Sequence, residues 1–307
     1  MSPRDLNISG VACQAIAWRR FPLNQYLIEA REAGYEGSEL TTWQAAQWSK
    51  ESKNLRMDLE RTGLPLVALY HSAQLCCQDS AEAELQKSIH AAEMAQSLGA
   101  RFLVLGNPPK HRVHSVTGLE MLRLNLDRLG EACAGMDITL VYQPHYGSPV
   151  QTPDEVGDLM GGTDPELVSL CLDTAHIAWG GGDPSALMMQ WGQRVRYIQL
   201  KDLRASAPGW RERMAWLIRY AQLGSLSGYT RGLYPLQQGL RAVSSVMFVV
   251  PGTGYLDFRA FRSAMESAGY QGWLTVELDA PLLYPGRAMA DGLEFTRATF
   301  DLLKSPK

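Results

Sequence analysis

Polar and ionisable residues recur in this sequence directly after short apolar segments. Such segments are typical of β-strands, and a carboxylate, imidazole or ammonium group at the end of a strand can bind a substrate or transfer a proton. A single residue of this kind is often only a cap or a solvated rim group, but several at matching positions indicate one site. The residues concerned are Glu39, His71, Gln143 with His145, Asp173 with His176, Gln199 with Lys201, and Glu277.

The spacing within these pairs favours convergence. Because side chains alternate along a strand, each glutamine shares a face with its partner two residues later, provided that the strand continues that far. His176 follows Asp173 by three residues, at a point where the chain leaves its strand and both side chains can turn inward. The pattern therefore predicts a single cluster of acids, bases and amides.

The elements that must position this cluster are eight apolar segments that alternate with amphipathic ones. That order predicts an α/β fold, a (β/α)8 TIM barrel, whose catalytic residues lie at the C-terminal ends of the strands. The predicted strands are Gly10–Ile16, Gly37–Leu40, Leu66–Tyr70, Phe102–Leu105, Thr139–Tyr142, Leu167–Leu172, Val195–Leu200 and Trp273–Leu278. The predicted helices are Leu23–Ala33, Ala45–Arg61, Ala81–Ser97, Leu119–Ala134, Thr152–Met160, Pro184–Trp191, Phe258–Ala268 and Ala288–Leu303.

The length of 307 residues suits one barrel, because barrels of about 250 residues or more are routinely single domains. We therefore predict one domain over residues 1–307. One connection is much longer than the others: Leu203–Pro251 contains a helix-like piece of its own at Trp210–Leu223. An excursion after the seventh strand emerges on the reactive face, so residues 203–251 are predicted to be an insertion that borders the pocket.

Charge and composition exclude several classes of protein. A net charge of -3 and a pI near 6.1 offer no basic surface for a phosphate backbone, so we expect no nucleic-acid partner. The first residues lack the pattern of a signal peptide and no apolar run is long enough for a bilayer span, so we expect a cytoplasmic protein without a membrane partner. The five cysteines have no paired spacing and are interpreted as buried apolar residues rather than disulfide or zinc ligands.

Several phrases of the sequence resemble the xylose-isomerase-like TIM barrels. They are Tyr142–Gly147, Leu172–His176 and Ile198–Asp202, in the order that this superfamily shows. Within the superfamily the chain most resembles the inosose dehydratases, enzymes of myo-inositol breakdown. The similarity extends to Gly180–Pro184, Phe248–Gly254, Asp257-Phe258, Gly272-Trp273 and Val276-Glu277, and more faintly to Ile16–Trp18 and Gly34–Leu40.

The resemblance implies one divalent metal, held by four residues at the ends of strands five to eight. The matching positions are Gln143, Asp173, Gln199 and Glu277. The family has histidine or glutamate at the first and histidine at the third, so two strong ligands are neutral amides here. Four oxygen ligands would suit Mn²⁺, Mg²⁺ or Ca²⁺ better than Zn²⁺. A tight, a weak and a metal-free site all stay open, and the expected cofactor is at most one Mn²⁺ or Mg²⁺, weak or absent.

The resemblance also implies a small polyhydroxylated keto substrate. The expected activity is that of a lyase (dehydratase) or isomerase that acts on a keto cyclitol or keto sugar through an enolate. Glu277 or Asp173 would be the base, His145 or His176 the acid, and Lys201 the cation that replaces the metal. The predicted substrate-binding residues are Trp18, Glu39, His71 and Arg204.

Two other functions are kept as alternatives. A sugar epimerase or isomerase of the same superfamily would use the same enolate with a different pocket. A metal-free barrel could instead be retained as a non-catalytic protein that binds a ligand or a partner. An endonuclease is excluded by the acidic charge and the missing histidine ligands. The oligomeric state, including a homo-oligomer, is left open.

Overall fold

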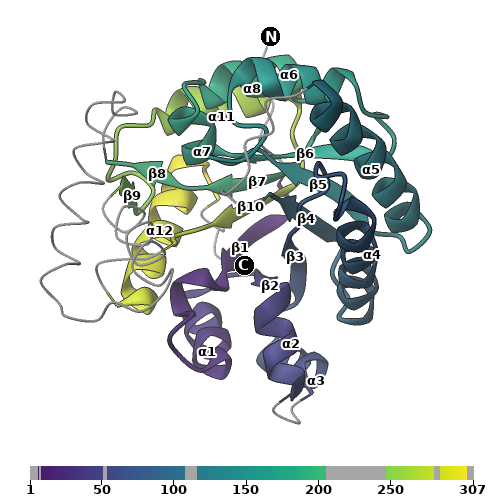
Figure 1. Ribbon diagram of the computed structural model, residues 1–307. Coiled ribbons are helices and arrows are strands. Elements are labelled where there is room, and N and C mark those ends of the chain that lie inside the picture. The colour runs from purple at the N-terminus through teal and green to yellow at the C-terminus, as the bar shows by residue number, and fades with distance from the viewer. Residues whose placement is uncertain are drawn as a thin grey trace, which may run out of the picture.

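The computed structural model describes residues 6, 8–50, 54–107, 116–204, 247–279 and 284–302. Eight parallel strands close into a barrel, and helices surround it (Figure 1). Each strand pairs with its neighbour in the chain, and the last pairs with the first, so the predicted (β/α)8 barrel is confirmed. The barrel strands are β1 (Gly10–Gln14), β2 (Gly37–Thr41), β3 (Leu66–Ser72), β4 (Phe102–Gly106), β5 (Thr139–Gln143), β6 (Val168–Asp173), β7 (Val195–Leu200) and β10 (Trp273–Val276).

The helices of the outer ring follow the predicted order. A short 3-10 helix, η1 (Ala15–Trp18), also comes directly after β1. The α-helices are α1 (Leu23–Ala33), α2 (Thr42–Lys50), α3 (Leu55–Thr62), α4 (Ala81–Ser97), α5 (Val116–Ala134), α6 (Pro153–Gly161), α7 (Thr174–Trp179), α8 (Pro184–Trp191), α11 (Phe258–Ala268) and α12 (Pro285–Thr299). None of the helices in the described part of the chain is both long and apolar enough to cross a membrane.

Two predicted elements end or divide differently in the structure, and one short helix was not predicted, each for a local reason. The single helix predicted over Ala45–Arg61 is divided into α2 and α3, because the Asn54 side chain accepts the backbone N–H of Met57 and starts a new helix. The strand predicted over Gly10–Ile16 ends at Gln14, whose side chain accepts the N–H of Ile16 and starts η1. The short helix α7 was not predicted, because its six residues are too few to show a helical period.

The inside of the barrel is layered. Its middle is filled by Ala12, Ala68, Val104, Val141 and Cys171, with the ring of Tyr197. Two residues further along three of these strands, the inward positions change from apolar to polar, at Gln143, Asp173 and Gln199. The period of two along each strand therefore places a polar layer at the C-terminal mouth, directly above an apolar plug.

The cysteine interpretation holds for four of the five residues. Cys13, Cys76, Cys133 and Cys171 are buried free thiols. Cys77 is exposed, contrary to the prediction, because in the loop between β3 and α4 the side chain of Cys76 is the one that turns to the core.

The two ends of the long excursion are held together. Asp202–Leu203 (β8) pairs antiparallel with Phe248–Val249 (β9). The Asp202 carboxylate also accepts four backbone N–H groups, including those of Gly252 at 3.0 Å and Gly254 at 2.8 Å. Residues 205–246, which contain the helix predicted at Trp210–Leu223, lie outside the described residues. That they border the pocket stays a prediction.

Candidate active site

A buried lysine stands at the centre of the barrel mouth. The Lys201 ammonium lies 2.6 Å from Glu277 Oε1, 3.3 Å from Asp173 Oδ2 and 3.5 Å from Asp279 Oδ2. It also lies 3.3 Å from His176 Nε2, and 4.9 Å from the centre of the Phe248 ring. The lysine side chain has no exposed surface. Such a charge is tolerated in the interior only because carboxylates at the end of β6 and directly after β10 surround it.

The protonation states follow from this arrangement. Burial alone lowers the pKa of Lys201, but the carboxylates of Asp173, Asp279 and Glu277 raise the pKa well above its usual value, so the group stays an ammonium. Burial raises the pKa of Glu277 to about 7, while the Lys201 ammonium holds that pKa down. Burial also raises the pKa of Asp173, against the same ammonium. Glu277 is therefore a carboxyl group that can both take up and release a proton near neutral pH.

The two predicted histidines contact one another at the same mouth, with ring centres 3.7 Å apart and the ring planes tilted by 36°. Burial lowers the pKa of both His145 and His176, and Lys201 adds to the effect, so both rings are neutral. The lysine donates to His176 Nε2, which assigns the ring proton of His176 to Nδ1. His145 Nδ1 lies 2.8 Å from the carbonyl of Tyr146 and must donate to it, so His145 Nε2 keeps a lone pair. The site thus offers one imidazole donor and one imidazole acceptor.

The two amides form the floor beneath the lysine. Gln143 Nε2 donates to Gln199 Oε1 at 2.5 Å and to Asp173 Oδ2 at 3.3 Å. Gln199 Nε2 in turn donates to Glu39 Oε1 at 2.8 Å. Tyr197 donates its hydroxyl to the other oxygen of Glu39. The four predicted metal positions, Gln143, Asp173, Gln199 and Glu277, therefore belong to one continuous cluster around Lys201.

This cluster does not fit a divalent cation. The gap between the two carboxylates is filled by the Lys201 ammonium, which already supplies a positive charge there. Gln143 turns its NH₂ group, rather than its oxygen, toward Asp173 and Gln199. An amide nitrogen that donates hydrogen bonds has no lone pair to give to a metal, so Gln143 could offer only its Oε1. Over the described ranges, no three His, Cys, Asp or Glu residues are grouped so that they could hold a metal ion.

Three buried polar atoms of the cluster have no hydrogen-bond partner. They are Gln143 Oε1, His176 Nδ1 and Glu277 Oε2. A buried polar group left without a partner costs about 1–3 kcal/mol, so three in one cluster point to a polar ligand that supplies the missing bonds. Together they offer two acceptors and, at His176, one donor. A polyhydroxylated molecule matches that set.

The predicted substrate-binding residues are placed differently from one another. Both carboxylate oxygens of Glu39 are taken by Gln199 and Tyr197, so Glu39 supports the floor of the site. Trp18 is buried at the end of η1 and donates to Glu29. His71 lies at the end of β3, where Thr42 contacts its Nδ1 at 3.2 Å. Arg204 is exposed and follows β8. A role in substrate binding stays a prediction for all four.

Sequence reasoning missed three residues that the structure brings to the site. Asp279 is the third carboxylate against Lys201, and it lies beyond the last strand, where no pattern pointed to it. The hydroxyl of Tyr70 occupies the space beside Gly106 on β4. A Cβ atom at Gly106 would lie only 2.1 Å from that hydroxyl, so a side chain there would exclude it. Burial and the Glu277 carboxylate both raise the pKa of Tyr70, so it remains a donor. Phe248 covers the lysine and the His176 ring from β9.

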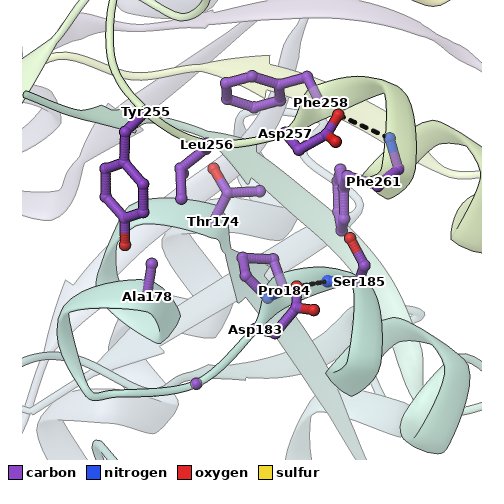
Figure 2. A pocket seen from close by; sticks show the side chains of 12 residues that line it. Thr174, Ala178, Asp183, Pro184, Ser185, Tyr255, Leu256, Asp257, Phe258 and Phe261 are labelled. Carbon is purple, nitrogen blue, oxygen red and sulfur yellow. Dashed lines mark hydrogen bonds between the residues drawn. The ribbon is translucent and has the colours of Figure 1, made fainter. Parts of the chain in front are cut away.

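Two of the phrases that carried the family resemblance have structural roles. Asp183 and Asp257 are the N-caps of α8 and α11, where Asp183 accepts one backbone N–H group of its helix and Asp257 accepts two. Figure 2 shows both side chains on the wall of a pocket between α7, α8 and α11, with the hydrogen bond of each cap drawn. Their carboxylates are thus engaged in starting helices.

The fold and the cluster at its mouth define a (β/α)8 enzyme-like barrel with a site built on the ends of its last four strands. The sequence matches the xylose isomerase-like TIM barrel family over residues 27–299. The chain belongs to that family.

Three relatives illustrate the similarity. The chain is 29% identical over 272 residues to an inosose dehydratase of Lacticaseibacillus casei, which covers 83% of this chain and 81% of the relative. It is 30% identical over 270 residues to the rhizopine catabolism protein MocC of Rhizobium meliloti, covering 84% and 75% of the two chains. The IOLI protein, solved with a zinc atom, superposes with a TM-score of 0.74 at 16% identity, over 97% of this chain and all (100%) of that one. That similarity concerns the fold alone.

Proposed function

We propose that this protein is a carbon–oxygen lyase of the inosose dehydratase type, which removes water from a small keto cyclitol or keto sugar through an enolate. The observation that carries the proposal is the buried Lys201 ammonium, held by three carboxylates beside a carboxyl group that titrates near neutral pH. Enolate formation needs a base close to a fixed positive charge, and this cluster provides both. The relatives named inosose dehydratase support the choice of reaction.

The proposed chemistry uses residues of this chain only. The ketone oxygen takes the place of one present acceptor of Lys201, so that one ammonium N–H donates to this oxygen, where negative charge develops. Glu277, through its unpartnered Oε2, takes the proton from the neighbouring carbon, and the electron pair of the C–H bond moves into the enolate. When the ketone re-forms, the bond to the β-hydroxyl breaks. That hydroxyl takes the proton back from Glu277 and departs as water.

The histidines fit a binding role in this scheme. Because the pKa values of both imidazoles are lowered, both rings are neutral at neutral pH and neither is an imidazolium acid. His176 Nδ1–H would donate to a substrate hydroxyl and His145 Nε2 would accept from another. Their prediction as the general acid remains to be tested by comparing His145→Gln and His176→Gln with Glu277→Gln.

The proposal is tested with a panel of keto cyclitols and keto sugars in D₂O, in the presence of a metal chelator. Deuterium uptake at the carbon beside the ketone reports enolate formation, and loss of one water is followed by mass spectrometry. We expect both with at least one compound, and neither with Glu277→Gln. Exchange without water loss would assign the epimerase or isomerase alternative. Binding of a compound without exchange would assign the non-catalytic alternative and overturn the proposal.

The pH dependence of turnover provides a separate prediction. Glu277 must be ionised to take a proton from carbon, and its pKa lies at about 7. The value of kcat/KM should therefore rise through about pH 7 and level off above it. A rate profile from pH 5 to 9 measures this. A profile that is flat across this range would show that Glu277 is not the base.

A further inference from the structure

Another pocket, of about 440 Å³, lies beside the mouth of the barrel, between the η1–α1 segment and α2. We call it the arginine–tryptophan pocket, and its walls include Trp18, Arg19, Arg20, Phe21, Trp43 and Trp48. Among the described residues that line it, two are arginines and none is acidic. The pocket therefore combines aromatic walls with positive charge, which suits a ring that carries an anionic group.

The pocket adjoins the candidate active site through shared elements. η1 begins directly after Gln14, at the end of β1, and α2 begins directly after Thr41, at the end of β2. The guanidinium of Arg19 donates to the main-chain carbonyl of Asp279. The carboxylate of Asp279 lies 3.5 Å from Lys201. Asp279 thus contacts both Arg19, in the wall of the pocket, and Lys201, in the candidate active site.

The inner wall of the pocket is fixed, while its rim is open. Trp18 is 1% exposed and donates to Glu29 at 2.8 Å, and Trp48 donates to Asp58 at 2.9 Å. By contrast Trp43 is 46% exposed and Phe21 is 38% exposed. A preformed wall with aromatic faces at its rim is the usual form of a small-molecule site.

We propose that the arginine–tryptophan pocket binds a carboxylate- or phosphate-bearing part of the substrate, so that the enzyme acts on an anionic keto sugar or keto cyclitol. Arg20 would pair with the anion, and the exposed aromatic rings would pack against the ring that carries it. The inference rests on the proposed function for the keto part of the substrate only. The anion-binding part is tested without turnover.

The test measures binding of glucuronate, glucose 6-phosphate, glucose and inorganic phosphate to the full chain at low ionic strength, through tryptophan fluorescence. We expect at least one of the two anionic sugars to bind about tenfold or more tightly than both glucose and inorganic phosphate, because a hydrogen bond to a charged group adds to the contacts of the ring. Rising salt should weaken that binding. The tighter of the two anionic sugars identifies the group as carboxylate or phosphate.

Two variants and a matched control locate the binding. Arg20→Ala and Trp43→Ala should each weaken the anionic sugar about tenfold. Arg101→Ala, which removes an exposed arginine paired with Asp137 before β4, should leave binding unchanged. Equal binding of glucose and the anionic sugars, or unchanged binding by Arg20→Ala, would overturn the proposal. So would a dimer in sedimentation that Trp43→Ala dissociates, since the pocket would then be a subunit interface. The probes carry no ketone and are not turned over, so a failure of the proposed reaction leaves this binding result unaffected.

Discussion

Replacing Lys201 by methionine is expected to destabilise the fold by about 3–5 kcal/mol at pH 8, and much less at pH 5. The substitution keeps an unbranched side chain, one atom shorter, but leaves Asp173 and Glu277 as buried carboxylates without their cation. The pKa of Glu277, already raised to about 7 by burial, then rises further, since the ammonium that held it down is gone. Thermal and urea unfolding across this pH range measures the effect.

The sign of the pH dependence follows from the protons bound. In the unfolded chain the carboxyl groups titrate near pH 4, whereas in the folded variant they keep their protons to a higher pH. The folded variant therefore loses stability relative to wild type as the pH rises from about 5 to 8. Lys201→Met with Glu277→Gln should recover part of the loss, because one unpaired charge is removed. A pH-independent loss would mean that methionine disturbs only the packing.

The same substitution should lower turnover by about 10²–10³-fold, the size expected when a fixed donor to a developing oxyanion is removed. Lys201→Arg serves as the matched control, because it keeps the charge but changes its position. A Lys201→Met variant that is folded at pH 6 and turns over at the wild-type rate would exclude Lys201 from the chemistry.

The barrel and its polar layer could be predicted because both depend on the periodic pattern of apolar and polar residues along the sequence. Apolar runs of strand length fix the strands, and the position directly after each run fixes the end of the barrel to which a side chain belongs. Gln143, Asp173 and Gln199 were found in this way, and they meet in one hydrogen-bonded chain. Lys201 was found because it shares a face with Gln199.

What could not be predicted depends on contacts between distant parts of the chain. Asp279 follows the last barrel strand with no periodic signal, and only the closed barrel brings its carboxylate to Lys201. From the sequence, Tyr70 is indistinguishable from an aromatic residue of the core. Only the structure shows that Gly106, on the next strand, leaves room for its hydroxyl. The sequence also gave no sign that the amide of Gln143 would turn its NH₂ group toward Asp173, since that orientation depends on which acceptors surround it.

The second large expected effect concerns metal binding after both glutamines are replaced. Gln143→His with Gln199→His should create a site of two imidazoles and two carboxylates at the ends of β5, β6, β7 and β10. Imidazole binds first-row divalent ions far better than a neutral amide does. The affinity for Mn²⁺, Co²⁺ or Zn²⁺ should rise by about one or more orders of magnitude, as measured by calorimetry.

Lys201 sets the limit of this gain, because its ammonium occupies the space between Asp173 and Glu277 that a cation would need. Adding Lys201→Met to the two histidines should therefore tighten metal binding further and raise the melting temperature in a metal-dependent way. Wild type should show little shift at the same low metal concentration. Tight metal binding by wild type, equal to that of the histidine variants, would show that the amides and the lysine yield to a metal. The ammonium would then not be the resident cation of this site, and the metal-free scheme proposed for the enolate would have to be abandoned.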